Sequence, residues 1–297
     1  MPAPVVLFAF NRPDTLRVTL DALAANDLAS ETQLFIRLDG PRNEAEADLV
    51  SAVREVACRA HGFKSVDVVG SDKNRGLASS VIAGVEEILA FSEEVIVMED
   101  DLVTHPEFLT FLNAALGRYR DDPAVFSVCG YSSDVRVPAG YGYDAYFCPR
   151  SSSWGWATWR DRWRSVDWNP TPASLNLHAR AFNRWGGSDC AAMLRAWSEG
   201  RNSSWAIRFC YSQFLQGKVS LFPVLSLVNP SAGFDGRGTH FKSYSRFHFR
   251  MMPAEHGPFR LPDTVSVIPS IRRSALRYHS LVLRGWSCLM NSVFRHA

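Results

Sequence analysis

VIVMEDDL, residues 95–102, is the stretch that decides the fold. Its first four residues are apolar, as in a strand buried on both faces, and Glu99, Asp100 and Asp101 follow directly. Three adjacent carboxylates at the tip of a buried strand repel one another unless a cation neutralises them. Mn²⁺ and Mg²⁺ bind carboxylate oxygens and bridge to phosphate, so the triplet predicts a metal site beside a phosphate. The alternative interpretation is a strand end whose acids cap the next helix.

Four further apolar runs flank this strand, and helical patterns separate them along the chain. The runs are VVLFAF at 5–10, LFIRL at 34–38, VDVVG at 66–70 and VFSVCG at 125–130. Strands that alternate with helices predict an α/β fold with a mostly parallel central sheet flanked by helices. Ligands of such sheets bind at the carboxyl ends of the strands, where residues 11–14, 39–43, 72–76 and 99–101 are rich in polar side chains.

The second half of the chain has a different composition. Eight of the nine tryptophans lie between residues 154 and 205. We expect short helices near 156–164, 189–199 and 205–216, and two short strands around 219–227. No linker separates the halves, so one domain with a composite second half is favoured over two independent domains. The tryptophans can form the core of the short helices or, as at Trp154, stack on sugar rings in a binding groove.

Composition excludes several classes of protein. The 297 residues are 46% hydrophobic and 21% charged, which excludes a disordered, collagen-like or coiled-coil chain. Six cysteines without a C-x-x-C pair argue against a zinc ribbon or a disulfide scaffold. The first strand follows Met1 closely without a basic leader, and no apolar stretch is long enough to span a bilayer, so we expect a cytoplasmic protein. The P-loop, nucleophile-elbow and zinc-protease motifs are missing.

Positive charge is gathered towards the C-terminus. From Arg246 onward the chain has eight arginines, no lysine and two acidic residues, within an overall net charge of +2. The apolar residues that recur there at helical spacing are Tyr278, Leu281, Val282, Trp286, Leu289, Met290 and Val293. The arginines around that stripe are Arg272, Arg273, Arg277, Arg284 and Arg295. Such a helix either lies on an anionic membrane surface, as a peripheral contact with the inner face, or docks on the domain.

Several motifs in chain order resemble those of one enzyme class. They are VVLFAFNRP, LDG, NRGL, VIVMEDDL with HPEF after it, SWGWATW, NSSWAIRF and GFDGRGTH. Over residues 4–241 this series resembles glycosyltransferases of the GT-A fold. It is similar to N-acetylglucosaminyltransferase I and its relatives, and to bacterial family 2 transferases of surface-polysaccharide clusters. The resemblance implies a GT-A domain over 1–245, with a nucleotide-binding half at 1–130 and an acceptor half at 131–245. A basic, amphipathic helical extension would occupy 246–297.

The resemblance implies metal-dependent transfer, with Mn²⁺ or Mg²⁺, of a hexosyl or N-acetylhexosaminyl group from a nucleotide-diphosphate sugar. It favours a UDP-linked donor, inversion at C1, and a glycan or lipid-linked acceptor in surface-polysaccharide synthesis. One alternative is a non-catalytic nucleotide- or carbohydrate-binding module of the same fold. Another is a sugar nucleotidyltransferase, which normally carries a glycine-rich loop that FAFNRPDT (8–15) lacks. A nucleic-acid partner is disfavoured, because no basic stripe with interleaved aromatic residues runs along the domain.

The resemblance also implies roles for individual residues of the first half. Asn11 and Arg12 would lie near the nucleotide, with the Arg12 guanidinium beside the diphosphate. Asp39 would accept the pyrimidine N–H, although Asp39-Gly40-Pro41 is also a favourable turn. The residues expected against the base and ribose are Asn74, Arg75 and Gly76.

Within the acidic triplet, the resemblance implies that Asp101 binds the metal. Asp100 and Glu99 would touch sugar hydroxyls, the ribose or metal-bound water. Trp154 would form part of the acceptor groove.

GFDGRGTH, residues 233–240, matches the position of a glycine loop that closes over the donor in the related transferases. The backbone N–H groups of Gly236 and Gly238 would wrap the diphosphate. Arg237 would screen the leaving group, and His240 would bind metal or phosphate. A surface loop with a spare histidine is the alternative interpretation.

An inverting transfer needs a general base near the acceptor hydroxyl. The eukaryotic relatives place adjacent acids after the tryptophan that Trp205 resembles, and this chain has none there. The remaining candidates are Asp235 in the glycine loop, Asp161 after GWATW, and Glu199 before Gly200. Asp235 ranks first, because closure of the loop would bring it to the sugar.

Overall fold

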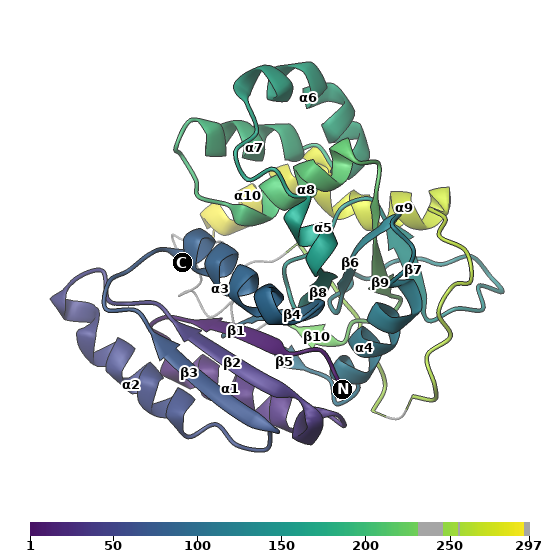
Figure 1. The fold of residues 1–297 in the computed structure, drawn as a ribbon. Helices are drawn as coiled ribbons and strands as arrows, with labels where there is room; N and C mark the ends of the chain where they lie inside the picture. Colours follow the sequence, from purple (N-terminus) through teal and green to yellow (C-terminus); the bar gives the residue numbers. More distant parts are fainter. Residues whose placement is uncertain (231–245, 255, 294–297) are drawn as a thin grey trace.

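Residues 1–230, 246–254 and 256–293 are described by the computed structural model of the chain (Figure 1). Eight strands form one sheet in the order β3-β2-β1-β4-β8-β6-β9-β7. The strands of the first half, which run parallel, are β1 Val5–Ala9, β2 Gln33–Leu38, β3 Ser65–Gly70 and β4 Glu94–Glu99. The others are β6 Val125–Cys129, β7 Ala145–Cys148, β8 Trp156–Trp159 and β9 Val219–Pro223, of which β7 and β8 run against the rest. The predicted α/β fold with a mostly parallel sheet is confirmed.

The sheet is buried on both faces, as β1 illustrates. Val5 and Leu7 lie in one core cluster and Val6 and Phe8 in the other, because side chains alternate along a strand. The helices over the first face are α1 Pro13–Ala24, α2 Ala47–Cys58 and α4 Phe108–Tyr119. Those over the second face are α3 Leu77–Phe91 and α8 Trp205–Leu215. With both faces covered, the strand ends remain as the place for a ligand.

The remaining elements lie outside the eight-stranded sheet and the helices named above. They are β5 Val103–Thr104, which pairs with β10 Val228–Asn229, and α5 Arg160–Arg164, α6 Pro172–Gly186, α7 Cys190–Ser198, α9 Pro269–Leu276 and α10 Leu281–Val293. Single turns of 3₁₀ helix lie at Ala29–Glu31, Glu44–Glu46 and Arg277–His279. Proline stands in the first turn of α1, α6 and α9, where its missing N–H costs no hydrogen bond. β7 and α6 were not predicted.

The prediction of a helix over 156–164 is wrong for its first four residues, which form β8. Trp156 pairs with Val97 of β4 and with Cys129 of β6, so β8 lies in the middle of the sheet. Its side chains alternate between the two cores, with Trp156 under α3 and Trp159 on the opposite face. Four residues that are buried on both faces suit a central strand, and the helix begins only at Arg160.

The chain beyond residue 245 packs on the same body as the sheet. Met252 is buried, and Phe247 and Phe259 are partly buried against the core that β1 shares with α1 and α4. α9 packs through Ile271 against Tyr146 of β7. In the part of the chain that the structure describes, no helix has the length and apolar character needed to cross a bilayer.

Candidate functional site

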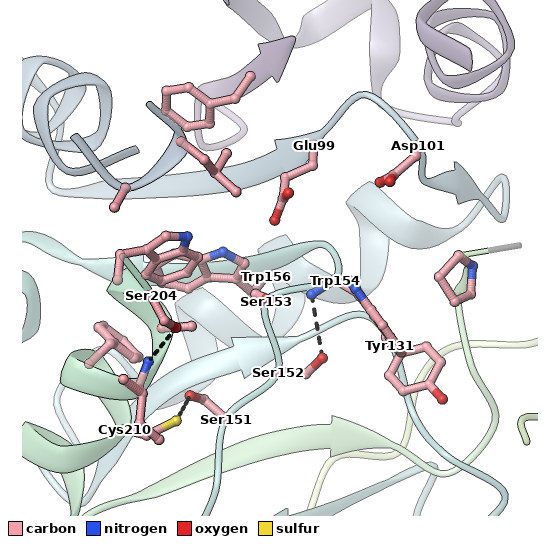
Figure 2. Close-up of a pocket in the computed structure, with 18 of the residues that line it drawn as sticks. Glu99, Asp101, Tyr131, Ser151, Ser152, Ser153, Trp154, Trp156, Ser204 and Cys210 are labelled. Carbon is pink, nitrogen blue, oxygen red and sulfur yellow. Dashed lines mark hydrogen bonds between the residues drawn. The ribbon is translucent and has the colours of Figure 1, made fainter. Parts of the chain in front are cut away.

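A cavity of about 1060 Å³ opens at the carboxyl ends of β1, β2 and β4. Figure 2 shows Glu99 and Asp101 on one side of it and Trp154, Trp156 and Ser204 on the other. The structure brings together nine residues that the sequence predicted for the site. They are Asn11, Arg12, Asp39, Asn74, Gly76, Glu99, Asp100, Asp101 and Trp154.

Asp39 holds the loop between β3 and α3. Its Oδ1 accepts a hydrogen bond from the backbone N–H of Arg75 at 2.7 Å, and its Oδ2 accepts one from Gly76 at 2.9 Å. The side-chain amide of Asn74 donates to the carbonyl of Gly40 at 2.9 Å and ties the same loop to the end of β2. Gly76 has a φ of 77°, a left-handed conformation that favours glycine. The Arg75 side chain is exposed and does not line the cavity.

Arg12 forms ion pairs with two of the three acids at the end of β4. Its guanidinium forms ion pairs with Asp100 and Asp101, the second at 3.0 Å between Nη1 and Oδ2. Asp100 also accepts a hydrogen bond from the backbone N–H of Phe10 at 3.4 Å. These contacts tie the loop after β1 to the tip of β4 and place Arg12 directly beside Asp101.

The triplet carries more negative charge than Arg12 balances. Burial raises the pKa of Asp100 to about 6, against the attraction of Arg12. Burial raises the pKa of Glu99 to about 8, and repulsion from Asp101 and Asp100 adds to the effect. Glu99 projects into the cavity (Figure 2). A cation bound there would relieve the repulsion among these groups.

Asp101 is the acid best placed to hold that cation. Its side chain is 20% exposed and, among the described residues, hydrogen-bonds through Oδ2 alone, to Arg12. Within residues 1–230, 246–254 and 256–293, no group of three or more His, Cys, Asp or Glu side chains forms a metal site. A divalent ion held by one or two carboxylates completes its shell with substrate phosphates and water, as Mg²⁺ commonly does. The donor set therefore fits Mn²⁺ or Mg²⁺ bound together with a diphosphate.

Aromatic side chains form the wall opposite the triplet. The Trp154 ring packs edge-on against Tyr131, with centroids 4.6 Å apart, and against Phe247 at 5.4 Å. Trp156 is 1% exposed and stacks on Trp205 at 5.1 Å. Trp156 is therefore a core residue, whereas Trp154 lies half-buried at the cavity surface, where stacking on a sugar ring stays a prediction.

Serines precede Trp205 in the cavity wall at the start of α8, and Ala206 and Ile207 follow it. Ser203 and Ser204 line the cavity, and Ser204 caps the helix by accepting a hydrogen bond from the N–H of Ile207 at 3.3 Å. Serine hydroxyls can bind sugar hydroxyls but are not bases at neutral pH. The carboxylates that line the described part of the cavity are Asp39, Glu99, Asp100, Asp101 and Asp189.

Asp161 does not reach the cavity. It follows Trp159, which pairs with Glu94 at the beginning of β4, because β8 runs antiparallel to β4. About five residues of strand, roughly 16 Å, separate that edge of the sheet from Glu99. The Asp161 carboxylate is 67% exposed and pairs with Arg162 at 2.8 Å. The reversed direction of β8 thus carries this predicted base to the opposite edge of the sheet.

Glu199 also lies outside the cavity. It ends α7, is 47% exposed and pairs with Arg201. Asp235, the predicted base that ranked first, lies outside the described residues. The other predicted residues of the glycine loop that lie outside them are Gly236, Arg237, Gly238 and His240.

Another part of the cavity wall contains charged residues that the sequence analysis did not single out. Arg150, Asp189, Arg246 and His279 line it, and they come from four separate segments of the chain. Arg150 follows β7, which was not predicted, and Asp189 directly precedes α7. The excess of arginine beyond residue 245 was the one signal that pointed to this region.

Residues 5–198 match the model of a protein family described as Glycosyl transferase family 2. The chain belongs to this family. The match and the observed sheet confirm the predicted GT-A fold for this family 2 protein, and family membership supports glycosyl transfer from a nucleotide sugar. No curated protein matches the chain.

Several solved structures are similar to this family 2 protein. Mannosyltransferase PcManGT from Pyrobaculum calidifontis, in complex with GDP-Man and Mn²⁺, is 18% identical with a TM-score of 0.39, over 54% of this chain and 47% of that one. TarS from S. aureus is 12% identical with a TM-score of 0.41, over 83% and 37%. Glucosyl-3-phosphoglycerate synthase from Mycobacterium tuberculosis, in complex with Mn²⁺, UDP and glucosyl-3-phosphoglycerate, is 15% identical with a TM-score of 0.37, over 62% and 67%. The chain thus spans less than half the length of the first two.

Proposed function

We propose that this family 2 protein transfers a hexosyl or N-acetylhexosaminyl group from a nucleotide-diphosphate sugar to a hydroxyl of a glycan or lipid-linked acceptor, with Mn²⁺ or Mg²⁺ bound. A UDP-linked donor and a role in surface-polysaccharide synthesis are part of the proposal. One observation carries it: a single cavity joins the Asp101 carboxylate, the loop held by Asp39 and the aromatic wall at Trp154. These are the chemistries needed by a diphosphate, a nucleoside and a sugar ring.

The loop held by Asp39 supports a nucleoside site. A carboxylate has about four acceptor positions, and Asp39 uses three of them for the backbone N–H groups of Gly40, Arg75 and Gly76. The remaining position can accept the N–H of a pyrimidine base. Asn74 and Gly76 would then pack against the base and ribose.

The tip of β4 supports a diphosphate site. A divalent ion held by Asp101 would neutralise the negative charge that develops on the leaving diphosphate. Arg12 orients Asp101 through its ion pair and adds a positive charge beside the same site. The Trp154 ring can stack on a sugar ring, and Glu99 and Asp100 can accept hydrogen bonds from sugar hydroxyls or the ribose. Asp235 stays the proposed base for an inverting attack at C1.

Nucleotide titration tests the proposal. UDP, GDP, CDP and TDP would each be titrated calorimetrically, with Mn²⁺ or with EDTA, followed by hydrolysis assays on sugars of the nucleotide that binds. The proposal expects one nucleotide to bind tightly only with metal, and its sugar to be hydrolysed slowly without acceptor. Binding without hydrolysis or transfer would favour the non-catalytic module, which Ala206 and Ile207 in place of acids after Trp205 also suit. If no nucleotide binds, the proposal fails.

Gly40→Ala is expected to weaken nucleotide binding by displacing the loop between β3 and α3. A Cβ at Gly40 would lie 2.6–2.7 Å from backbone atoms of Ser71 and Lys73, which cannot rotate away as a side chain can. Overpacking of this kind costs about 1–3 kcal/mol of unfolding free energy. Denaturant unfolding and calorimetry would measure both effects. Gly117→Ala is the control, because its Cβ meets nothing within 4 Å. Unchanged nucleotide affinity in Gly40→Ala would contradict the proposed site.

The outer face of α10 supports peripheral contact with an anionic membrane. Leu281 and Val282 are 71% and 79% exposed, and Trp286 and Leu289 are 52% and 55% exposed. With 3.6 residues per turn these four lie on one side of the helix, while Ser287, on the opposite side, is buried. α10 therefore docks on the domain through its less apolar side, and among the described residues Leu281, Val282 and Trp286 are exposed on the other side.

The charge around α10 supports an anionic lipid surface as its proposed partner. After Asp263 the sequence contains five arginines and no acidic residue. Each basic residue near such a surface contributes about 1 kcal/mol of binding free energy. An apolar helix face edged with arginine is typical of helices that lie in the membrane interface.

We expect the double substitution Trp286→Ser and Leu289→Ser to lower binding to vesicles of phosphatidylglycerol and phosphatidylcholine at least about tenfold. Each apolar side chain that no longer enters the membrane interface removes roughly 1.5–3 kcal/mol of binding free energy. Leu177→Ser is the control, since Leu177 is 77% exposed on α6. Cosedimentation at two salt concentrations measures the effect. A dimer in solution that the double substitution dissociates, without any vesicle binding, would overturn this proposal in favour of a second copy.

A further inference from the structure

One part of the cavity wall, called the basic end below, is rich in basic side chains. Arg150, Arg246 and His279 line it, and Asp189 is the one acid among the described residues there. Arg150 and Asp189 balance each other, because the guanidinium contacts both carboxylate oxygens, at 2.7 and 3.2 Å. Arg150 also donates to the carbonyl of Gly186 at 3.1 Å. This pair is a closed arrangement with no net charge.

His279 does not add positive charge to this end. Its Nδ1 lies 3.7 Å from Oδ2 of Asp189. Burial, together with the charge of Arg150, lowers the pKa of His279 to about 4 against the pull of Asp189. The imidazole is therefore neutral at pH 7, and Asp189 has no second cation to balance.

Arg246 supplies a positive charge to this part of the cavity wall. Its Nε donates to the carbonyl of Tyr278 at 2.7 Å, and its guanidinium lies over the Phe247 ring at 4.4 Å. Within the described residues no carboxylate forms an ion pair with it. Burial lowers the pKa of Arg246; Asp189 opposes this shift, whereas Arg150 and Arg284 reinforce it. A half-buried cation without a counter-ion is costly unless a ligand supplies the missing negative charge.

We propose that this basic end of the cavity, built around Arg246, binds a phosphate group carried by the acceptor. The inference rests on the proposed function and narrows its acceptor to a phosphorylated one. A guanidinium is planar and presents paired donors that match phosphate oxygens. The donor diphosphate would instead bind beside Asp101, where a divalent ion would neutralise its negative charge.

The aromatic wall links Trp154 to the basic end of the cavity, so it can hold the sugar of a phosphorylated acceptor. Phe247 directly follows Arg246, and its ring packs against Trp154. A sugar stacked on Trp154 would thus lie between the donor and Arg246, with its phosphate towards the arginine. α10 begins two residues after His279, so the basic end also adjoins the helix proposed to contact lipid. Two sources of phosphate fit this chemistry: a lipid phosphate and a soluble sugar phosphate.

Phosphate binding in the presence of donor nucleotide tests the inference. Inorganic phosphate would be titrated into the full chain saturated with UDP and Mg²⁺, with chloride as the control anion. Wild-type protein is expected to bind phosphate saturably, and Arg246→Gln to weaken binding about tenfold or more, since a charge-assisted contact is lost. Arg246→Lys, which keeps the charge, should lose less. Arg273→Gln is the matched control, because Arg273 is exposed on α9 and absent from the cavity.

A transfer assay separates the two sources of phosphate. The acceptors would be a sugar 1-phosphate in buffer, the same sugar linked to polyprenyl phosphate in micelles, and the sugar without phosphate. We expect Arg246→Gln to raise KM about tenfold for whichever phosphorylated acceptor is used, and Arg273→Gln to leave KM and donor hydrolysis unchanged. Equal phosphate affinity in Arg246→Gln and Arg273→Gln, or no phosphate binding while UDP binds, would overturn the inference. A failure of UDP itself to bind would instead contradict the proposed function.

Discussion

Asp101→Asn is expected to remove metal-dependent nucleotide binding and to lower glycosyl transfer about a thousandfold or more, because it deletes the negative charge that holds the cation against the diphosphate. Asparagine keeps the size of the side chain, so the fold should survive. Arg12 would keep its second partner, Asp100, and the loop after β1 would stay tied to β4. The measurement is calorimetric titration with Mn²⁺ and nucleotide, followed by a steady-state transfer assay.

The control for this substitution is Asp121→Asn, which removes one carboxylate from an exposed turn outside the cavity. It should leave nucleotide binding and transfer unchanged. Metal-dependent binding that persists in Asp101→Asn would show that the triplet is a strand end and helix cap. The transferase proposal would then lose its principal support.

Asp39→Ala is expected to lower the free energy of unfolding by about 2–4 kcal/mol and to remove most of the nucleotide affinity. Asp39 is 8% exposed, and its carboxylate accepts hydrogen bonds from the backbone N–H groups of Gly40, Arg75 and Gly76. Alanine would leave these donors without an acceptor in a poorly solvated place. Denaturant unfolding gives the first effect and titration with the preferred nucleotide gives the second.

Two further variants make the Asp39 result interpretable. Asp39→Asn replaces one acceptor oxygen with a donor, so its loss of stability should be intermediate. Asp72→Ala, an exposed position in the same loop, should change neither stability nor affinity. If Asp39→Ala destabilised the protein but bound nucleotide with wild-type affinity, Asp39 would act on the loop alone and would not belong to the nucleotide site.

The first half of the protein was readable from its sequence because its signals are local. The apolar runs at 5–10 and 95–98 became β1 and β4, and one of the helical patterns between the strands is α3. Parallel strands bring their carboxyl ends to one edge, so sequence position alone predicted that Asp39 and Asp101 would line the same cavity.

The role of Asp39 shows where such reasoning stops. The sequence left open whether Asp39-Gly40-Pro41 is a turn or part of a binding site. The structure shows an additional contact, since the carboxylate binds backbone N–H groups about 36 residues later in the chain. No local pattern marks an acceptor for distant backbone donors, because a carboxylate has the same sequence signature in either role.

The second half was less readable because its elements pair over long sequence distances. WATW has the composition of a buried helix segment as well as of a buried strand, and its pairing with β4 and β6 decided between them. That pairing also moved Asp161 to the far edge of the sheet. A candidate base chosen by its distance along the sequence was thus excluded by the direction of one strand.

From the chain alone one can read the α/β class, the edge of the sheet that binds a ligand and the acidic triplet, because strand periodicity and adjacent charges act locally. The tertiary structure adds the pairing of Arg12 with the triplet, the exposed apolar side chains of α10 and the basic end of the cavity. Each of these depends on side chains from separate segments meeting in space. Arg150 and Arg246 therefore line the cavity because distant segments pack together, and no sequence motif marks them.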